Sequence, residues 1–398
     1  MHPALLTVFC GLLLSVSAFS NDILLPSLFA IQRDFETSIE RVQLVVPVFM
    51  LVSAGGQLVF GAGSDRFGRR AAIIAGLVCY LAGSIISMLA GGIGMLLAGR
   101  GLQGFGSACC QVVARAILRD TNQGAQLARA MALATAIFSF GPIAAPLIGI
   151  GLLNLGDWRT VFGALLTFGA VLLVATIVLF KETHLQRDPR ALEPARLAGA
   201  FASVVRHPQS RFFLMMASLL YFGIISYVAN SPRLFRSSFG IDGISFGLLF
   251  ATTGLGIIVG QIANHRLITD FGVIATTRGA AVAMCGIAAT LALLSGTGLV
   301  AWWSFTALIF FFNALFLLVF SNAASLVIDP HKKIAGLAAS LFGCVTQLSG
   351  SLLTFIALPL MRGDMVIWSC GLLLVTGIVA VSMLRYAPFD AADLPPTR

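Results

Sequence analysis

The sequence predicts an all-α membrane protein with twelve transmembrane helices in two halves of six. Of its 398 residues, 58% are apolar and 10% are charged, whereas soluble domains carry about 25% charged residues. Apolar runs recur along the chain at the length of about 20 residues that crosses a bilayer, and one long polar stretch divides them into two equal sets. A soluble globular protein is therefore excluded.

The polar stretch also predicts the domain organisation. The first six apolar runs lie at about residues 4–30, 42–60, 71–93, 95–118, 129–153 and 159–180. The second six lie at about residues 211–231, 244–264, 279–298, 300–327, 335–359 and 366–386. We therefore expect an N-terminal half over 1–180, a cytoplasmic central linker over 181–210, a C-terminal half over 211–386 and a cytoplasmic tail over 387–398.

The basic residues predict the orientation. The formal net charge is +9, and most of the 25 lysines and arginines fall in cytoplasmic segments if both termini are cytoplasmic. The charge therefore indicates topology, and no nucleic-acid partner is expected. The tryptophans fall at predicted helix ends on the outer side, where amphipathic rings favour the headgroup layer; they are Trp158, Trp302, Trp303 and Trp368.

Two ionisable residues lie at matching depth inside predicted spans, Asp22 in the first and Arg100 in the fourth. An unpaired charge in hydrocarbon costs at least about 3 kcal/mol, so both should face a shared interior or a watery cavity. Asp22 is a candidate for proton binding and release, with Arg100 as the partner that changes its proton affinity. The alternatives are a static pair, or an Arg100 that organises its helix through Gln103 or backbone carbonyls. Arg115 lies nearer the cytoplasmic end and can snorkel.

A glycine-rich basic loop, Gly61–Arg70, joins the second and third spans. Its glycines permit a tight reversal and its cations favour the cytoplasmic side. It lacks the residue order of a phosphate-binding loop and follows no strand, so nucleotide binding is not expected.

The fifth span contains two prolines four residues apart, Pro142 and Pro146, between Gly141 and Gly149. Prolines remove backbone donors and favour a kink, and small residues allow close helix contact. The bend is a candidate hinge or seal, and the alternative is a merely kinked packing helix.

The chain shows no catalytic or metal-binding pattern. The five histidines fall at termini or in predicted loops, and no two have the spacing of metal ligands. The seven cysteines all lie in apolar stretches and are interpreted as small packing residues. We therefore expect no metal, no cofactor and no enzymatic activity.

Together, three of these motifs resemble those of the major facilitator superfamily. The loop Gly61–Arg70 is similar to its cytoplasmic loop signature, Leu96–Gly104 to its fourth-helix motif, and Gly141–Gly149 to its antiporter motif. The resemblance extends over the whole chain, and finer features resemble the bicyclomycin-resistance (Bcr/CflA) branch of drug/proton antiporters. These features are Asn21–Pro26, Arg115–Asp120, Lys181–Thr183, Tyr227–Pro232 and Ala335–Ser340 with Gln347.

The resemblance implies two six-helix lobes that alternate between inward-open and outward-open states around a cavity lined by the first, fourth, seventh and tenth helices. It places Asp22 and Arg100 at proton-coupling positions. It also implies a cytoplasmic conformational latch, to which we assign Gly61, Asp65, Arg66, Gly68, Arg69, Arg70 and Arg115. The antiporter-motif helix contributes Gly141, Pro142, Pro146 and Gly149.

Polar residues on the expected cavity helices are candidates for substrate contact, and hydrogen bonding between helices is the alternative for each. They are Asn21, Gln103, Tyr227, Asn230, Asn313, Asn322 and Gln347. The chain departs from the branch at Asn21, Leu24 and Phe29, where threonine, tyrosine and proline are usual, and at Ala62 and Gly63 in the loop, so the identity of the substrate transfers less well than the coupling.

The sequence therefore favours a proton-driven exporter of small amphipathic drugs or metabolites, with many spans in a bacterial inner (cytoplasmic) membrane. We expect a small-molecule substrate, protons and the lipid bilayer as partners, a monomeric chain, and the proton gradient as the energy source. The alternatives are a dedicated metabolite exporter, a proton-coupled importer, and a non-transporting membrane sensor or scaffold. The fifth-helix motif favours antiport.

Overall fold

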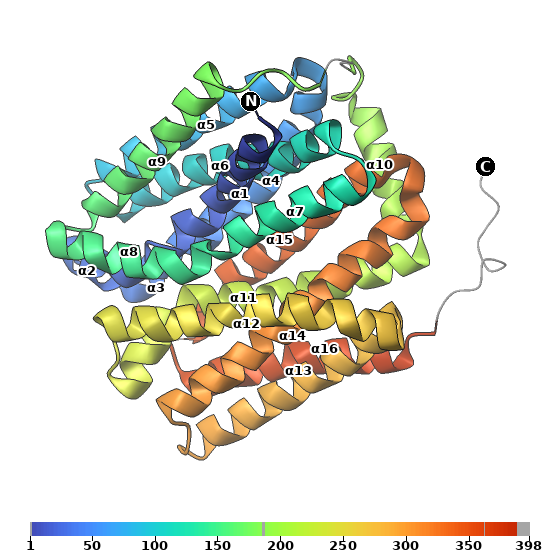
Figure 1. Ribbon diagram of the computed structural model, residues 1–398. Helices are drawn as coiled ribbons and strands as arrows, with labels where there is room; N and C mark the ends of the chain where they lie inside the picture. The colour runs from blue at the N-terminus through green and yellow to red at the C-terminus, as the bar shows by residue number, and fades with distance from the viewer. Residues whose placement is uncertain (1, 185–187, 362, 388–398) are drawn as a thin grey trace.

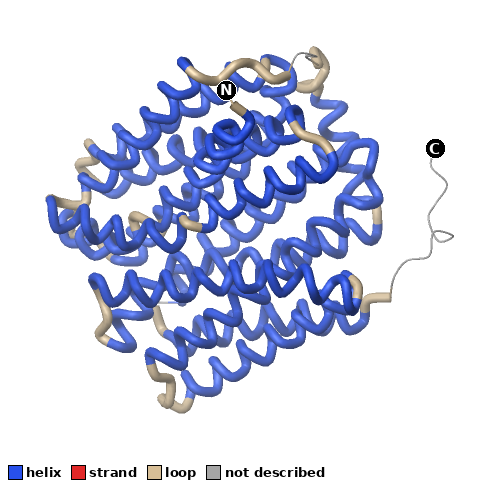
Figure 2. Tube along the Cα trace, viewed as in Figure 1, coloured by secondary structure: helices blue, strands red, loops and turns tan. Residues whose placement is uncertain are grey.

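A computed structural model describes residues 2–184, 188–361 and 363–387. These residues form helices and connecting loops, with no strand among them (Figure 2). The helices form two groups that lie one above the other, with the N-terminal group in blue to green and the C-terminal group in yellow to red (Figure 1). The prediction of an all-α fold with two lobes is confirmed.

The N-terminal lobe contains nine helices and one short 3₁₀ turn. In chain order they are α1 (Pro3–Asp22), η1 (Leu25–Ser27), α2 (Leu28–Asp34), α3 (Ile39–Gln43), α4 (Val45–Phe67), α5 (Arg69–Met88), α6 (Ile93–Thr121), α7 (Gly124–Ser139), α8 (Gly141–Leu155) and α9 (Arg159–Val178).

The C-terminal lobe follows the linker helix α10 (Pro194–Arg206). It contains α11 (Pro208–Phe239), α12 (Gly243–Phe271), α13 (Val273–Gly296), α14 (Trp302–Ile328), η2 (Asp329–Ile334), α15 (Ala335–Met361) and α16 (Met365–Arg385). We call the end of the bundle that carries α10 the linker end, and the opposite end the α3 end; the basic residues predict that the linker end is cytoplasmic.

Eleven helical segments of the described chain are long and apolar enough to cross a bilayer. The twelfth spanning helix is α6, which is 29 residues long and carries Arg100, Gln103 and Arg115. Its polar residues are tolerated because α6 lies inside the lobe, packed against α4, α5 and α1 rather than against lipid.

Two spans are broken in the middle. The first span stops at Asp22 and resumes as η1 and α2, because Pro26 has no N–H to continue the helical hydrogen bonds. The fifth span breaks between Ser139 and Gly141, immediately before Pro142. The helical hydrogen bonding is thus interrupted at the antiporter motif, while Phe140 at the interruption keeps helical φ and ψ of −69° and −23°.

The two breaks lie against each other. A Cβ atom added to Gly149 of α8 would lie 2.2 Å from the carbonyl oxygen of Ile23, and one added to Gly141 would lie 3.6 Å from the Cβ of Ala18. Only a residue without a side chain allows α8 to approach the α1 break this closely. This contact helps to hold the backbone next to Asp22 in place.

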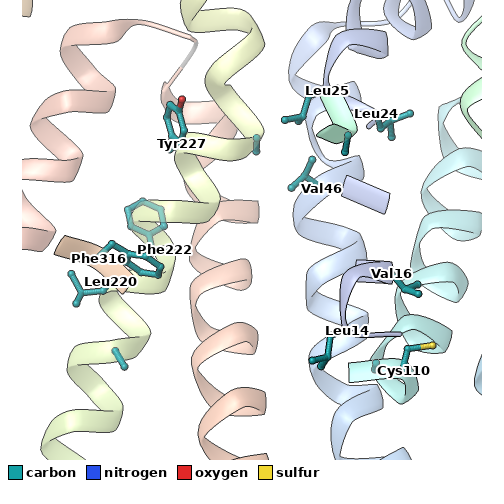
Figure 3. Close-up of a cluster of buried hydrophobic side chains, with 14 of the residues drawn as sticks. Leu14, Val16, Leu24, Leu25, Val46, Cys110, Leu220, Phe222, Tyr227 and Phe316 are labelled. Carbon is teal, nitrogen blue, oxygen red and sulfur yellow. The ribbon is translucent and has the colours of Figure 1, made fainter. Parts of the chain in front are cut away.

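Buried apolar side chains of both lobes belong to one cluster. Figure 3 shows part of it, with Leu14, Val16 and Cys110 of the N-terminal lobe on one side and Phe222 with Phe316 of the C-terminal lobe on the other. All five are buried. The apolar core thus extends over both lobes.

All four tryptophans lie at helix starts, as the sequence predicts. Trp302 and Trp303 are exposed at the start of α14. Trp158 precedes α9 and Trp368 lies in the first turn of α16. These two are buried, and their indole N–H groups donate to Asp34 and Ser226.

The close contact at Gly149 generates a prediction about stability. We expect Gly149→Ala to lower the free energy of unfolding by about 1–3 kcal/mol, because the added methyl group overlaps backbone that cannot rotate away. Gly151→Ala is the matched control, since no atom lies within 4 Å of a Cβ at that position of the same helix. Thermal unfolding of the purified protein measures both, and equal melting temperatures for the two variants would contradict this account.

Candidate functional site

Asp22 lies at the break in the first span, as the last residue of α1. Its side chain is 6% exposed, and it makes no hydrogen bond or ion pair with any residue that the structure describes. The Tyr227 hydroxyl of α11 lies within electrostatic range of the carboxylate. Asp22 therefore lies where the two lobes meet, without a counter-ion.

Arg100 is fully buried, and neutral groups surround it. Its guanidinium lies 4.2 Å from the centre of the Phe49 ring. Its N–H groups donate to four oxygen atoms: Nε to the Val45 carbonyl at 3.2 Å, Nη1 to the Ser20 carbonyl at 3.2 Å and to Gln103 Oε1 at 2.6 Å, and Nη2 to Asn21 Oδ1 at 2.6 Å. Arg100 thus ties α1, α4 and α6 together.

The expected pair of Asp22 and Arg100 is not formed in this structure. The matching depth is present, because Arg100 binds Ser20 and Asn21, which directly precede Asp22. The contact itself is replaced by hydrogen bonds to amide and carbonyl oxygens, which satisfy the guanidinium without a carboxylate. The interpretation of Arg100 as an organiser of its helix fits these contacts.

The prediction of a loop over Gly61–Arg70 is wrong: Gly61–Phe67 end α4, Arg69 and Arg70 begin α5, and only Gly68 is not helical. This segment is built around one buried arginine, Arg69. Gly68 has a φ of 100°, which lets the chain reverse between α4 and α5. Arg69 then points back under the loop, where its Nη1 atom lies 2.5 Å from Asp65 Oδ1 and 2.7 Å from Ser64 Oγ, and its Nε atom lies 2.9 Å from Asp120 Oδ2. This cluster joins α4, α5 and the end of α6.

Glu182 fixes the start of the linker to the same loop. Its carboxylate accepts the backbone N–H groups of Arg69, Arg70, Thr183 and His184 at 2.9–3.1 Å. Burial alone would raise the pKa of Glu182, but these four hydrogen bonds outweigh it, and the pKa lies below its usual value. The negative charge also lies at the N-terminus of α5, where the helix dipole favours it.

The predicted latch residues contact the N-terminal lobe and the linker rather than the C-terminal lobe directly. The Asp65 carbonyl accepts the N–H of Asp188 at 3.0 Å, and Arg70 donates to the Ile177 carbonyl at 2.6 Å. Arg66 lies over the ring of Phe67. Near the lobe interface, a Cβ on Gly61 would lie 3.9 Å from Ser340 Oγ of α15.

Arg115 is not part of this cluster. It makes no contact with Asp65, Arg69 or Asp120 in the described chain. The charged residue that acts on it electrostatically is Arg119. Its assignment to the latch is therefore not supported by this structure. The cluster around Arg69 needs no second arginine, because Arg69 already pairs with both carboxylates.

Several expected cavity residues make hydrogen bonds within one lobe. Asn21 and Gln103 bind Arg100, as described above. Asn322 and Asn264 exchange two hydrogen bonds at 3.0 and 3.1 Å. The remaining bonds in the C-terminal lobe run from Asn313 Nδ2 to the Thr253 carbonyl and between the hydroxyls of Tyr227 and Thr253.

Two expected cavity residues join the lobes instead. Gln347 Oε1 accepts from Gln57 Nε2 at 2.7 Å, and Gln347 Nε2 donates to the Met50 carbonyl at 2.9 Å. At the α3 end, Asn230 Oδ1 accepts from Gln43 Nε2 at 2.9 Å. All three bonds connect α11 or α15 with the start or middle of the second span.

An ion pair and a ring contact complete the contact at the α3 end. Glu40 Oε1 lies 2.7 Å from Arg233 Nη1, and the Arg236 guanidinium lies 4.3 Å from the centre of the Phe29 ring. The α3 ends of the lobes are thus held together by polar contacts. Sequence reasoning assigned no role to Glu40, Gln43, Gln57 or Arg233, because a residue at the edge of an apolar run does not reveal its partner across the lobe interface.

Comparison with known proteins is consistent with this geometry. The family model described as Major Facilitator Superfamily matches residues 10–354. A bicyclomycin resistance protein homolog of Haemophilus influenzae is 26% identical over 352 residues, which cover 86% of each chain. The multidrug resistance protein MdtL of Escherichia coli is 29% identical over 235 residues, which cover 58% of each chain.

A solved structure has the same fold. The D-xylose–proton symporter superposes with a TM-score of 0.77 over 96% of this chain and 97% of that chain, at 15% sequence identity. The family match extends over most of the sequence. The structure agrees with it in having two lobes of membrane-spanning helices, the glycine-rich segment organised by Arg69 and the broken fifth span. The chain therefore belongs to the major facilitator superfamily of membrane transporters.

Proposed function

We propose that this transporter exports small amphipathic drugs or metabolites from the cytoplasm in exchange for protons, by alternating access. The observation that carries the proposal is the buried Asp22 carboxyl group at the lobe interface, which has no cation beside it. The named resistance functions of the Haemophilus influenzae and Escherichia coli relatives support export of drugs.

Protonation of Asp22 and the arrangement of the lobes depend on each other, because the arrangement decides whether water reaches the carboxyl group. An ionised carboxylate enclosed between the lobes without a partner is costly, whereas a neutral carboxyl group is tolerated. The arrangement with the α3 end closed therefore favours protonated Asp22. Opening the α3 end hydrates the group, which can then exchange its proton with the outer solution.

The contacts at the α3 end suit this cycle. The ion pair of Glu40 with Arg233 is partly exposed, at 29% and 18% of the side chains, so water can replace it at modest cost. Arg100 stays bound inside its own lobe through its four oxygen partners. The lobes can separate without disturbing the Arg100 contacts beside Asp22.

The first test of this proposal is substrate-evoked proton movement. In liposomes containing a pH dye, we expect bicyclomycin or ethidium to evoke proton flux through the native protein and none above background through Asp22→Asn, because the amide cannot carry a proton. Glu36→Gln, an exposed residue at the α3 end, is the control and should keep the flux. Equal flux through native protein and Asp22→Asn would refute coupling at this residue.

The second test concerns the α3 end. We expect Glu40→Gln to shift the lobes toward separation at this end by about fivefold in population, since a partly exposed ion pair contributes about 1 kcal/mol. Spin labels at Glu36→Cys and Ser238→Cys, in a Cys370→Ser background, report the distance between the lobes. Asp157→Asn removes an exposed charge at the same end that pairs only within its own lobe, with Arg159, and should leave the distances unchanged. An unchanged distance distribution in Glu40→Gln would contradict the role of this ion pair in holding the lobes together at the α3 end.

A further inference from the structure

Side-chain hydrogen bonds join the two lobes at two levels of the described chain. At the α3 end, Gln43 of α3 donates to Asn230 of α11. In the middle of the bundle, Gln57 of α4 donates to Gln347 of α15, and Gln347 donates to the Met50 carbonyl of α4. We call this second group, Met50, Gln57 and Gln347, the midspan contact.

The midspan contact lies at the centre of both helices. Gln57 is twelve residues after Val45, where α4 begins, and ten residues before Phe67, where α4 ends. Gln347 is twelve residues after the first residue of α15 and fourteen before the last. Each glutamine is therefore within about 2 Å of the midpoint of its helix. The contact thus lies near the middle of the membrane-spanning part of the molecule.

The amide group of Gln347 is bonded at both its polar atoms. Its Oε1 atom accepts from Gln57 Nε2 at 2.7 Å, and its Nε2 atom donates to the Met50 carbonyl at 2.9 Å. Both glutamines are buried. Lipid offers no replacement hydrogen bonds at this depth, so breaking the contact leaves buried polar groups unpaired. Water can instead replace the partly exposed ion pair of Glu40 with Arg233 at the α3 end.

The helices α4 and α15 fit together most closely at the midspan contact. A Cβ atom added to Gly343, one turn before Gln347, would lie 2.8 Å from Gln57 Oε1. A side chain at position 343 would therefore push Gln57 away from its partner. Nearer the linker end, a Cβ atom on Gly61 would lie 3.9 Å from Ser340 Oγ, which is an ordinary van der Waals distance. Gly343 thus provides the space in which the two glutamines meet.

The lobes meet differently on either side of the midspan contact. Towards the α3 end they are joined directly, by Gln43 with Asn230 and by Glu40 with Arg233. Towards the linker end, a cavity of about 580 Å³ is bounded by α4 and α6 of one lobe, α15 of the other and the linker helix α10. A rotation of the lobes that opens the α3 end narrows this cavity, and the displacement is smallest between the two ends. The midspan contact lies at that level.

The opposite side of the lobe interface, where α8 packs against α12, has no such bond. A Cβ atom on Gly254 would lie 3.5 Å from the Cβ of Pro142, and one on Gly247 would lie 2.6 Å from Ile150 Cδ1. No hydrogen bond joins α8 to α12 among the described residues. Apolar contacts have no preferred direction, so these two helices can slide past each other. The interface is therefore fixed on its α4–α15 side and free on its α8–α12 side.

We propose that the midspan contact is the pivot of the lobe movement. Gln57 and Gln347 stay bonded while the α3 end and the linker end open in turn, and the larger displacement occurs on the α8–α12 side. This inference rests on the proposed alternating access and names the residues about which the lobes turn. Gln57 and Gln347 are then positioning residues for transport, and the substrate contact predicted for Gln347 is replaced by this role.

Cross-linking tests the pivot without requiring a transported substrate. The seven native cysteines are replaced by alanine, and thiols are introduced as Gln57→Cys with Gln347→Cys, or as Gln43→Cys with Asn230→Cys. A short bismaleimide joins either pair through the space that the two amide side chains leave. Spin labels on p-acetylphenylalanine, introduced at positions 36 and 238 for the α3 end and at 123 and 270 for the linker end, report the distances between the lobes in lipid nanodiscs.

The two cross-links should differ in their effect. We expect the link between positions 57 and 347 to leave both distance distributions as they are in the unlinked protein, because it joins points that do not separate. The link between positions 43 and 230 should narrow the distribution at the α3 end at least twofold. Narrowing at either end on linking position 57 to 347 would overturn the pivot.

A single substitution completes the test. Gln347→Met keeps the size of the side chain and removes both hydrogen bonds, and it should about double the width of the distance distributions at both ends, because the lobes lose their fixed point. Asn264→Leu is the matched control, since it removes a buried amide pair within the C-terminal lobe and should change neither distribution. If Gln347→Met does not fold, Gln57→Met removes the bond between the glutamines. Unchanged distributions in the methionine variant would also overturn the pivot.

The outcome is separable from that of the export proposal. Failure of the cross-linking or methionine results in a protein that shows proton flux dependent on Asp22 would reject only the pivot. The expected distance distributions in a protein without substrate-evoked proton flux would reject the export mechanism and leave the pivot in place.

Discussion

The structure depends on one constraint: a polar group between membrane-spanning helices must be satisfied by protein or by water, because lipid offers no hydrogen bonds. Arg100 is satisfied by protein atoms. Its donors take up oxygen atoms from α1, α4 and its own helix, and so its charge becomes a structural centre of the N-terminal lobe. The break in the first span, which follows from Pro26, lies next to this cluster, and the carbonyl of Ser20 just before the break is one of the partners of Arg100. Asp22 is then left at the lobe interface without a partner.

Contacts within a lobe and contacts between the lobes differ in kind. Contacts within a lobe are dry and close, as where Gly149 lets α8 reach the Ile23 carbonyl. Contacts between lobes at the α3 end are polar: Glu40 with Arg233 is partly exposed, and Gln43 with Asn230 is buried. The exposed ion pair loses little free energy when water replaces it. The buried amide pair must find other partners when the lobes separate.

Much of the fold could be predicted from the sequence, because span length and apolarity are local properties. The matching depth of Asp22 and Arg100 was predictable for the same reason, since the number of residues between each of them and the outer end of its own helix can be counted in the sequence. The partners were not predictable, because a guanidinium can donate to carbonyl, amide or carboxylate oxygens and the sequence does not show which of them lies nearby. Only the packing of α1 against α6 selects Asn21. Glu182 illustrates another limit: an acid in a polar stretch gives no sign that it will accept four backbone N–H groups.

The position of Asp22 bears on how the arrangement of the lobes can act on a buried carboxyl group. Arg100 fixes the neighbouring part of α6 and the end of α1 through its oxygen partners, so Asp22 is held by the N-terminal lobe. The Tyr227 hydroxyl of α11 lies within electrostatic range of Asp22 from the C-terminal lobe. A movement of α11 relative to α6 would therefore change the surroundings of Asp22 and leave the Arg100 contacts, which lie within one lobe, in place.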